Sequence, residues 1–460
     1  MNFSASNTML WDAMIQFGIL STILLAANVL RRKVAIVRKS LAPTAVIGGF
    51  LALLLRIFGL IKLDGTFLDM ITYHTIAIGF IALSLRIPEK RPETAANSLD
   101  GPKSGALIVS CYLVQGILGI LITAGLAYTF MPGLFKAAGI LLPMGYGQGP
   151  GQANNVGATY EQLGFAGGQS FGLSLAAAGF LCACMVGVIY INILHKHKRI
   201  NIQTIQEKAE ALTIEDFQSE NEIPVSQSVD RLSIQTAMVF VVYLATYLVS
   251  LGITSLLEKT APGISATVSP LIWGFNFIVG SLAAMLFRQS FNWFTKAKWM
   301  KRQYPNNYLL SRLSGCAFDY MIVAGIAAID IKDLSGLWIP FIILSILGGW
   351  VTLVYLKWLC KKLYPAYYYE GLLSMYGMMT GTISSGVMLL RELDPNYRTP
   401  AANNLLTGSS YGILFGAPML ILIGMAPKSD LRLLIVLLLQ IIYLIFLLLF
   451  MLRVKPGRKS

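Results

Sequence analysis

Charged side chains are scarce in this chain of 460 residues. Asp, Glu, Lys and Arg make up 13% of it, while 55% of the residues are hydrophobic. An average soluble domain has about 25% charged residues, so the composition predicts an integral membrane protein. The net charge of +14 does not indicate nucleic-acid binding, because Lys and Arg lie in short clusters between apolar runs and form no continuous basic face.

Histidine and cysteine are also rare, with three and five residues respectively. The cysteines lie in or next to apolar runs, so we interpret them as buried small side chains and not as a disulfide framework or a metal centre. The sequence has no phosphate-binding loop and no H-E-x-x-H motif. We expect no cofactor, and no metal other than a possible coupling Na⁺.

A single G-x-S-x-G pattern, typical of serine hydrolases, covers Gly168 to Gly172. The motif requires a turn from a strand to a helix, with a histidine and an acid nearby. Here it begins an apolar run, and His195 and His197 lie at the far end of that run. We interpret the motif as small-residue helix packing, and a membrane-embedded hydrolase is the alternative.

Eleven apolar runs are candidate membrane-spanning helices, which need about 20 residues each. They cover residues 14–30, 43–61, 71–85, 106–130, 168–194, 234–257, 268–287, 314–329, 337–359, 408–426 and 431–452. No basic segment precedes the first run, so we expect it to be a true span and not a cleavable signal peptide.

Clusters of Lys and Arg follow every second run, and the loops between them contain few basic residues. Because basic loops stay on the cytoplasmic side, this pattern predicts an outside N-terminus and a cytoplasmic C-terminus. We expect a multi-pass protein of the bacterial cytoplasmic (inner) membrane.

Two segments rich in small residues interrupt this apolar pattern, at 144–155 and 375–386. They align without a gap, which pairs Tyr146 with Tyr376 and Gly151 with Gly381. Non-helical backbone at membrane depth is tolerated where protein buries it or where it lines a cavity. Interruptions at matching positions in two halves indicate a transporter's binding site, so we predict re-entrant hairpins at about 134–163 and 370–398.

The predicted fold is all-α: an inverted repeat of about 5+5 transmembrane helices, two re-entrant hairpins and one extra C-terminal helix. The predicted units are residues 1–194 for the first repeat, 195–232 for a cytoplasmic linker, and 233–426 for the second repeat. Residues 427–460 form the extra helix and a basic tail.

The two hairpins supply the candidate binding residues, because glycine lets backbone approach a ligand and neutral side chains offer donors and acceptors. These residues are Gly147, Gln148, Gly149, Gly151, Asn154, Asn155, Gly377, Thr380, Gly381, Thr382, Ser384 and Ser385. We expect Asn154, Asn155, Ser384 and Ser385 to face one shared cavity. The alternative is that the small residues only permit close helix packing.

Asp319 is the clearest carboxylate inside a predicted span. An ionisable group there is a functional candidate, as a ligand for Na⁺ or as a carrier of H⁺. The alternative is an anchor near the headgroups, paired with Arg312.

Several segments together resemble the bacterial sodium:glutamate symporter family. They are Pro43 with Gly48-Gly49, Gly147-Gln148-Gly149-Pro150-Gly151 with Gly164-Phe165, the stretch from Tyr369 to Ser385, and loosely Phe415-Gly416-Ala417-Pro418. The resemblance implies a homodimer in which a transport domain moves against a scaffold. It also implies uptake of an acidic amino acid driven by Na⁺.

We therefore expect a symporter for a small anionic or zwitterionic, carboxylate-bearing solute, driven by Na⁺ or H⁺. We do not expect an enzyme, because the sequence lacks an acid–base constellation. A membrane-embedded enzyme and a passive channel on a transporter-like fold are the alternatives.

Overall fold

The computed structural model describes residues 8–35, 37, 42–87, 99–196, 225–260, 262–274, 276–297, 305–394 and 399–453. Within these ranges the regular structure is helical, without any strand. Nine of the described helices are long and apolar enough to cross a membrane. The expectation of an all-helical, multi-pass membrane protein is confirmed.

The nine long helices match nine of the eleven predicted spans. They are α1 (Thr8–Lys33), α4 (Gly65–Leu85), α5 (Asp100–Thr129), α7 (Gly168–Lys196), α9 (Val225–Thr260), α12 (Asn307–Ala327), α13 (Trp338–Leu363), α16 (Ala401–Met425) and α17 (Asp430–Arg453).

The other two predicted spans are not single long helices. The run at 43–61 contains only α3 (Thr44–Ile57), which has 14 residues and is about 21 Å long at 1.5 Å per residue. A bilayer core is about 30 Å thick. The chain turns just beyond α3, where Gly59 has φ +68°. The run at 268–287 is divided between α10 (Pro262–Gly274) and α11 (Asn276–Lys296).

Short helices fill the rest of the described chain. They are η1 (Lys136–Ile140), η2 (Pro143–Gln148), α6 (Pro150–Gln162), η4 (Lys332–Leu334), η5 (Pro365–Tyr367), α14 (Tyr368–Thr380), α15 (Ile383–Arg391) and η6 (Ala426–Lys428). At the predicted linker, 195–232, α7 extends to Lys196 and α9 begins at Val225. The remainder of that linker lies outside the described residues.

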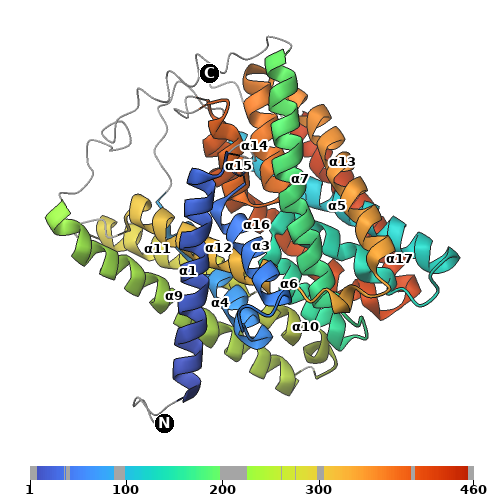
Figure 1. Cartoon of the computed structure of the whole chain (residues 1–460), viewed down its shortest axis with the longest axis horizontal. Coiled ribbons are helices and arrows are strands. Elements are labelled where there is room, and N and C mark those ends of the chain that lie inside the picture. The colour runs from blue at the N-terminus through green and yellow to red at the C-terminus, as the bar shows by residue number, and fades with distance from the viewer. Residues whose placement is uncertain are drawn as a thin grey trace.

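One large buried core joins helices from both halves of the chain. In Figure 1, α6 and α12 lie in the middle, with α9 and α11 on one side and α13 and α17 on the other. Many apolar side chains of α9, α13 and α17 face outward, such as Leu244, Trp350 and Phe446 at 59%, 62% and 62% exposed. Such faces are suited to lipid. Among the described residues a single ion pair forms, 2.6 Å between Lys136 Nζ and Asp430 Oδ2, and it joins η1 to α17.

Glycines let two segments cross closely where α5 meets η1. A Cβ on Gly119 would lie 2.7 Å from the carbonyl carbon of Gly139 and 3.0 Å from its Cα. Thr123 strengthens the crossing, because its Oγ1 donates to the Lys136 carbonyl at 2.7 Å and accepts from Gly139 N at 3.2 Å. This contact holds the segment that leads into η2 against α5.

We predict that Gly119→Val lowers the stability of the protein by about 1–3 kcal/mol, the usual cost of overpacking, because the new side chain forces α5 away from η1. Gly125→Val is the matched control. Gly125 lies on the same helix, and a Cβ there would meet nothing within 4 Å. Thermal unfolding in detergent measures both variants. Equal melting temperatures for the two would contradict the close crossing.

Candidate functional site

The helical backbone is interrupted in each of the two predicted segments. The first break is at Gly149, between η2 and α6, where φ is +93°. The second break is at Gly381 and Thr382, between α14 and α15. The gapless alignment paired Gly151 with Gly381, so the first break falls two residues earlier than that alignment predicts.

The two breaks lie against each other. A Cβ on Gly149 would be 3.3 Å from Thr382 Cγ2 and 3.7 Å from the Gly381 carbonyl oxygen. Glycine is needed at this position both for the positive φ and for the close approach. Two segments from different halves of the chain therefore meet where their backbones stop being helical.

Matching tyrosines attach both segments to α13. The Tyr146 hydroxyl donates to the Ser345 carbonyl at 2.5 Å, and the Tyr376 hydroxyl donates to the Gly349 carbonyl at 3.4 Å. The two acceptors are one helical turn apart on α13. The alignment of Tyr146 with Tyr376 thus corresponds to similar contacts in the fold.

Gln115 on α5 connects the second break to the same helices. Its Nε2 donates to the Met379 carbonyl and to Thr352 Oγ1, both at 2.9 Å. Gln115 is fully buried, so these bonds form away from water and hold the end of α14 between α5 and α13.

A cavity of about 90 Å³ lies beside the two breaks. At about 10–15 Å³ per water position, it has room for a small solute. Its lining comes from nine helices and from Thr382, and consists of Phe80, Ile108, Tyr112, Gly147, Gln148, Gln152, Phe277, Ile278, Phe318, Met321, Met378, Thr382, Ile383, Ser409, Gly412, Ile413, Gly416, Met419, Leu420 and Ile423. No member of this lining is charged.

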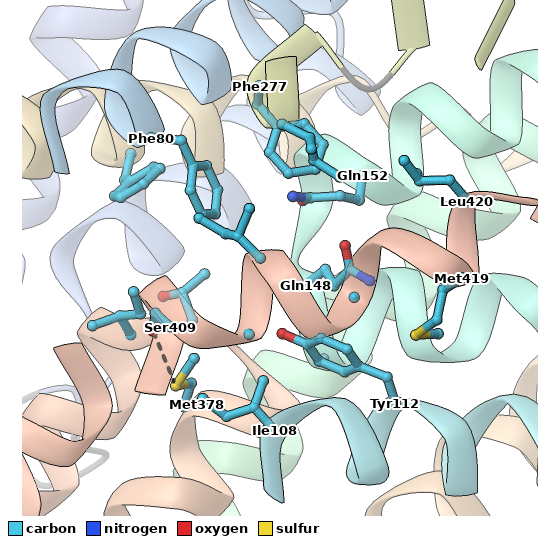
Figure 2. A pocket seen from close by; sticks show the side chains of 18 of the residues that line it. Phe80, Ile108, Tyr112, Gln148, Gln152, Phe277, Met378, Ser409, Met419 and Leu420 are labelled. Carbon is cyan, nitrogen blue, oxygen red and sulfur yellow. Dashed lines mark hydrogen bonds between the residues drawn. The ribbon is translucent and has the colours of Figure 1, made fainter. Parts of the chain in front are cut away.

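The cavity has an aromatic side, and two amide side chains lie between that side and the opposite one. Figure 2 shows Phe80 and Phe277 on one side, Tyr112, Ile108 and Met378 on the other, and the amides of Gln148 and Gln152 between them. The Phe80 ring packs 5.1 Å from that of Phe277 and 5.3 Å from that of Phe318, measured between centroids.

Two buried polar atoms of the lining have no hydrogen-bond partner in the protein. They are Gln152 Oε1 and Thr382 Oγ1, and the Gln152 side chain is only 1% exposed. A buried acceptor without a partner costs about 1–3 kcal/mol. Both residues lie where a ligand in the cavity could supply the missing donor.

The breaks also leave helix ends without caps. No side chain caps the N-terminus of α6 or of α15, and the first intrahelical bonds there are donated by Ala153 and Gly386. The N–H groups before those residues lack an intrahelical acceptor, and a helix N-terminus carries partial positive charge. α14 ends at Thr380, beside the start of α15, and presents the opposite partial charge.

Of the predicted binding residues, Gly147, Gln148 and Thr382 line the cavity, and Gly149 lies at the contact between the breaks. Three other glycines serve packing instead. A Cβ on Gly151 would meet the Ile76 side chain, one on Gly377 would be 2.9 Å from Gly386 Cα, and one on Gly381 would be 2.8 Å from Ser385 Oγ.

The expectation that Asn154, Asn155 and Ser385 face the cavity is not met, since none of them lines it. Asn154 Oδ1 accepts from Gln169 Nε2 at 2.8 Å, and Asn155 Nδ2 donates to the Gly274 carbonyl at 2.5 Å. Asn154 is two residues beyond Gln152, about 200° further round α6, and so points elsewhere. The side chain of Ser384 lies outside the described part.

Thr380 and Ser385 are also buried near the second break. The Thr380 hydroxyl donates to the Tyr376 carbonyl of its own helix at 2.8 Å. Ser385 Oγ has no partner in the protein, but it faces Gly381 and not the cavity.

At the far end of α6, Glu161 belongs to the same polar network as Asn154. Its Oε1 accepts from the Gln169 backbone N–H at 3.0 Å. Burial raises the pKa of Glu161, and the hydrogen bond from Gln169 N opposes that rise. This network holds α6 against the start of α7.

Asp319 lies on α12, one residue from Phe318 of the lining, but it does not line the cavity itself. The expected alternative of a pair with Arg312 is not found, because the single ion pair of the described chain lies elsewhere. Arg312 instead stacks over the Tyr308 ring, 5.0 Å from its centroid.

Ser170, from the G-x-S-x-G pattern, is a structural link between α7 and the turn after α12. Its Oγ donates to Asp333 Oδ2 at 2.9 Å and accepts from Asp330 N at 3.2 Å. The motif lies in a helix and not at a strand-to-helix turn.

Sequence reasoning missed most of the cavity wall. Gln152 could have been found, since it lies in the first small-residue segment, four residues after Gln148. Tyr112, Phe80, Phe277 and Ser409 carry no local signal, because they come from helices far apart in the sequence.

Neither the models of known protein families nor the sequences of curated proteins match this chain.

We predict that Gly149→Ala disturbs the cavity as well as the backbone. Gly164→Ala is the matched control, because Gly164 has a similar φ of +98° and open space around its Cβ position. Strain at such backbone angles costs about 1–3 kcal/mol, so both variants should melt earlier than the parent protein. Gly149→Ala should melt earlier still, because it also displaces Thr382. Equal melting temperatures for the two variants would show that the breaks do not touch.

Proposed function

We propose that this protein is a secondary active transporter, a symporter for a small carboxylate-bearing solute. The observation that carries the proposal is the meeting of the two breaks, Gly149 against Gly381 and Thr382, beside a cavity. Irregular backbone deep in a membrane protein is expected where it lines a cavity. Paired breaks in two halves are typical of transporter binding sites.

The proposed architecture is an inverted repeat whose two broken segments are re-entrant hairpins. One feature supports the hairpins: the close packing of α14 on α15 at Gly377 and Gly386. With basic loops in the cytoplasm of a bacterium, the N-terminus is outside and the two hairpins enter from opposite faces. Rocking of one part against the other then alternates access to the cavity.

The helix ends at the breaks support a carboxylate as the recognised group. The N-termini of α6 and α15 present unbonded N–H groups and partial positive charge beside the cavity. A carboxylate bound there needs no cationic side chain, in agreement with a lining that has none.

The coupling ion is Na⁺ or H⁺ in this proposal. Carbonyl groups freed at the end of α14 are hard oxygen ligands suited to Na⁺. Asp319, close to the cavity through its neighbour Phe318, is the proposed carrier of the coupling charge. The resemblance to the sodium:glutamate symporters favours Na⁺ and a homodimer.

Transport is tested with the purified full-length protein in proteoliposomes. L-Glutamate, L-leucine, succinate and L-lactate are supplied outside under an imposed inward gradient of Na⁺ or H⁺. We expect at least one of them to accumulate inside above its external concentration, because coupled transport uses the free energy of the ion gradient to concentrate the solute. Protein-free liposomes and an ionophore that collapses the gradient are the controls.

Equilibration without accumulation would instead indicate a passive channel. If no carboxylate crosses the membrane under either gradient, the proposal is wrong.

We predict that Asp319→Asn reduces ion-driven accumulation about fivefold or more, the range of a coupling free energy of 1–3 kcal/mol, while exchange of internal for external solute persists. The variant loses the charge that binds the coupling ion, but its cavity is unchanged. Asp12→Asn is the control, as a carboxylate on the exposed face of α1. Parent-like accumulation and ion dependence in Asp319→Asn would show that Asp319 has no coupling role.

A further inference from the structure

The lining of the cavity narrows the class of solute further than the requirement for a carboxylate alone. No charged side chain lines the cavity, and uncompensated charge in a low-dielectric site is costly. A solute whose own charges sum to zero lowers that cost, because its two charges partly compensate each other. A second carboxylate, as in glutamate, would find no cation in the lining to pair with.

The polar groups at the breaks are suited to two opposite charges side by side. The ends of α6 and α15 supply donors for a carboxylate. Gln152 Oε1 and Thr382 Oγ1 are buried and unpartnered, and both line the cavity. An ammonium group has three donors and no acceptor, so it could satisfy both oxygens at once. The nearby end of α14, with its partial negative charge, favours the same group.

Apart from Tyr112, Gln148 and Ser409, the rest of the wall is apolar, and it includes three phenylalanines. Phe80 packs on Phe277 and Phe318, and Met321, Met378 and Met419 continue the apolar surface. Gly79 makes room for this wall, since a Cβ there would be 2.8 Å from Phe318 Cδ1. Figure 2 shows Phe80 and Phe277 across the cavity from Tyr112, so a side chain that faces them should be apolar.

We propose that the solute is a zwitterionic amino acid with an apolar side chain. Its carboxylate lies at the N-termini of α6 and α15, its ammonium group donates to Gln152 and Thr382, and its side chain packs against Phe80, Phe277 and Phe318. This inference rests on the proposed transport function for its biological meaning, but the binding site itself can be tested without transport.

The test is equilibrium binding to the purified full-length protein, with L-leucine, 4-methylpentanoate and L-glutamate as probes. 4-Methylpentanoate has the carbon skeleton of leucine without its amine. We expect leucine to bind at least tenfold more tightly than either of the others, because a hydrogen bond to a charged group changes affinity by about ten- to a hundredfold.

Two variants locate the ammonium group. Gln152→Leu and Thr382→Val each remove one unpartnered oxygen, and each should weaken leucine binding about tenfold or more while leaving that of 4-methylpentanoate unchanged. Gln440→Leu is the matched control: Gln440 is also buried, at 2% exposed, with an unpartnered Oε1, but it lies on α17 away from the cavity. Leucine affinity should stay at the parent value in that variant.

Tighter binding of glutamate, equal binding of 4-methylpentanoate and leucine, or no binding of leucine would each overturn the inference. Glutamate or another carboxylate accumulating in proteoliposomes would then leave the transport function standing. Leucine binding without any accumulation would support the inference and count against transport.

Discussion

Buried backbone polar groups at the two helix breaks are the constraint on which the rest of the structure depends. Inside a membrane protein an N–H or C=O group without a partner costs several kcal/mol, so each break must be enclosed by other protein groups. Gly149 packs against Thr382 of the other break, and Gln115 Nε2 donates a hydrogen bond to the Met379 carbonyl. The helices around the breaks, α5, α7, α12 and α13, form the enclosure.

The same constraint explains why the cavity is located where it is. Enclosure is incomplete at the N-termini of α6 and α15, which have no side-chain caps, and at Gln152 and Thr382, whose oxygens have no partner. In a well-packed fold such groups are rare. Two such oxygens, those of Gln152 and Thr382, line the same small cavity beside the uncapped helix ends, and this juxtaposition is the physical basis of the ligand-binding proposal.

Glycine has two separate roles in the segments that carry the site. At Gly149 it permits a positive φ and contact with the second break, whereas Gly151, Gly377 and Gly381 permit close packing of neighbouring groups. The packing interpretation therefore applies at Gly151, Gly377 and Gly381, whereas the binding interpretation stays a proposal for the residues that line the cavity. The distinction depends on where each missing Cβ would point, which a one-dimensional pattern does not contain.

The sequence by itself determined the membrane class, nine of the spans and the approximate location of both breaks. Long apolar runs and clustered small residues are local signals, because each pattern lies within one continuous segment of the sequence. Only the tertiary structure decided which side chains share the cavity. It brought Phe80, Tyr112, Phe277 and Ser409 to residues of the breaks, and it turned Asn154 towards Gln169. The tertiary structure also decided the length of α3 and the division between α10 and α11. The apolar runs alone predict one continuous span in each place.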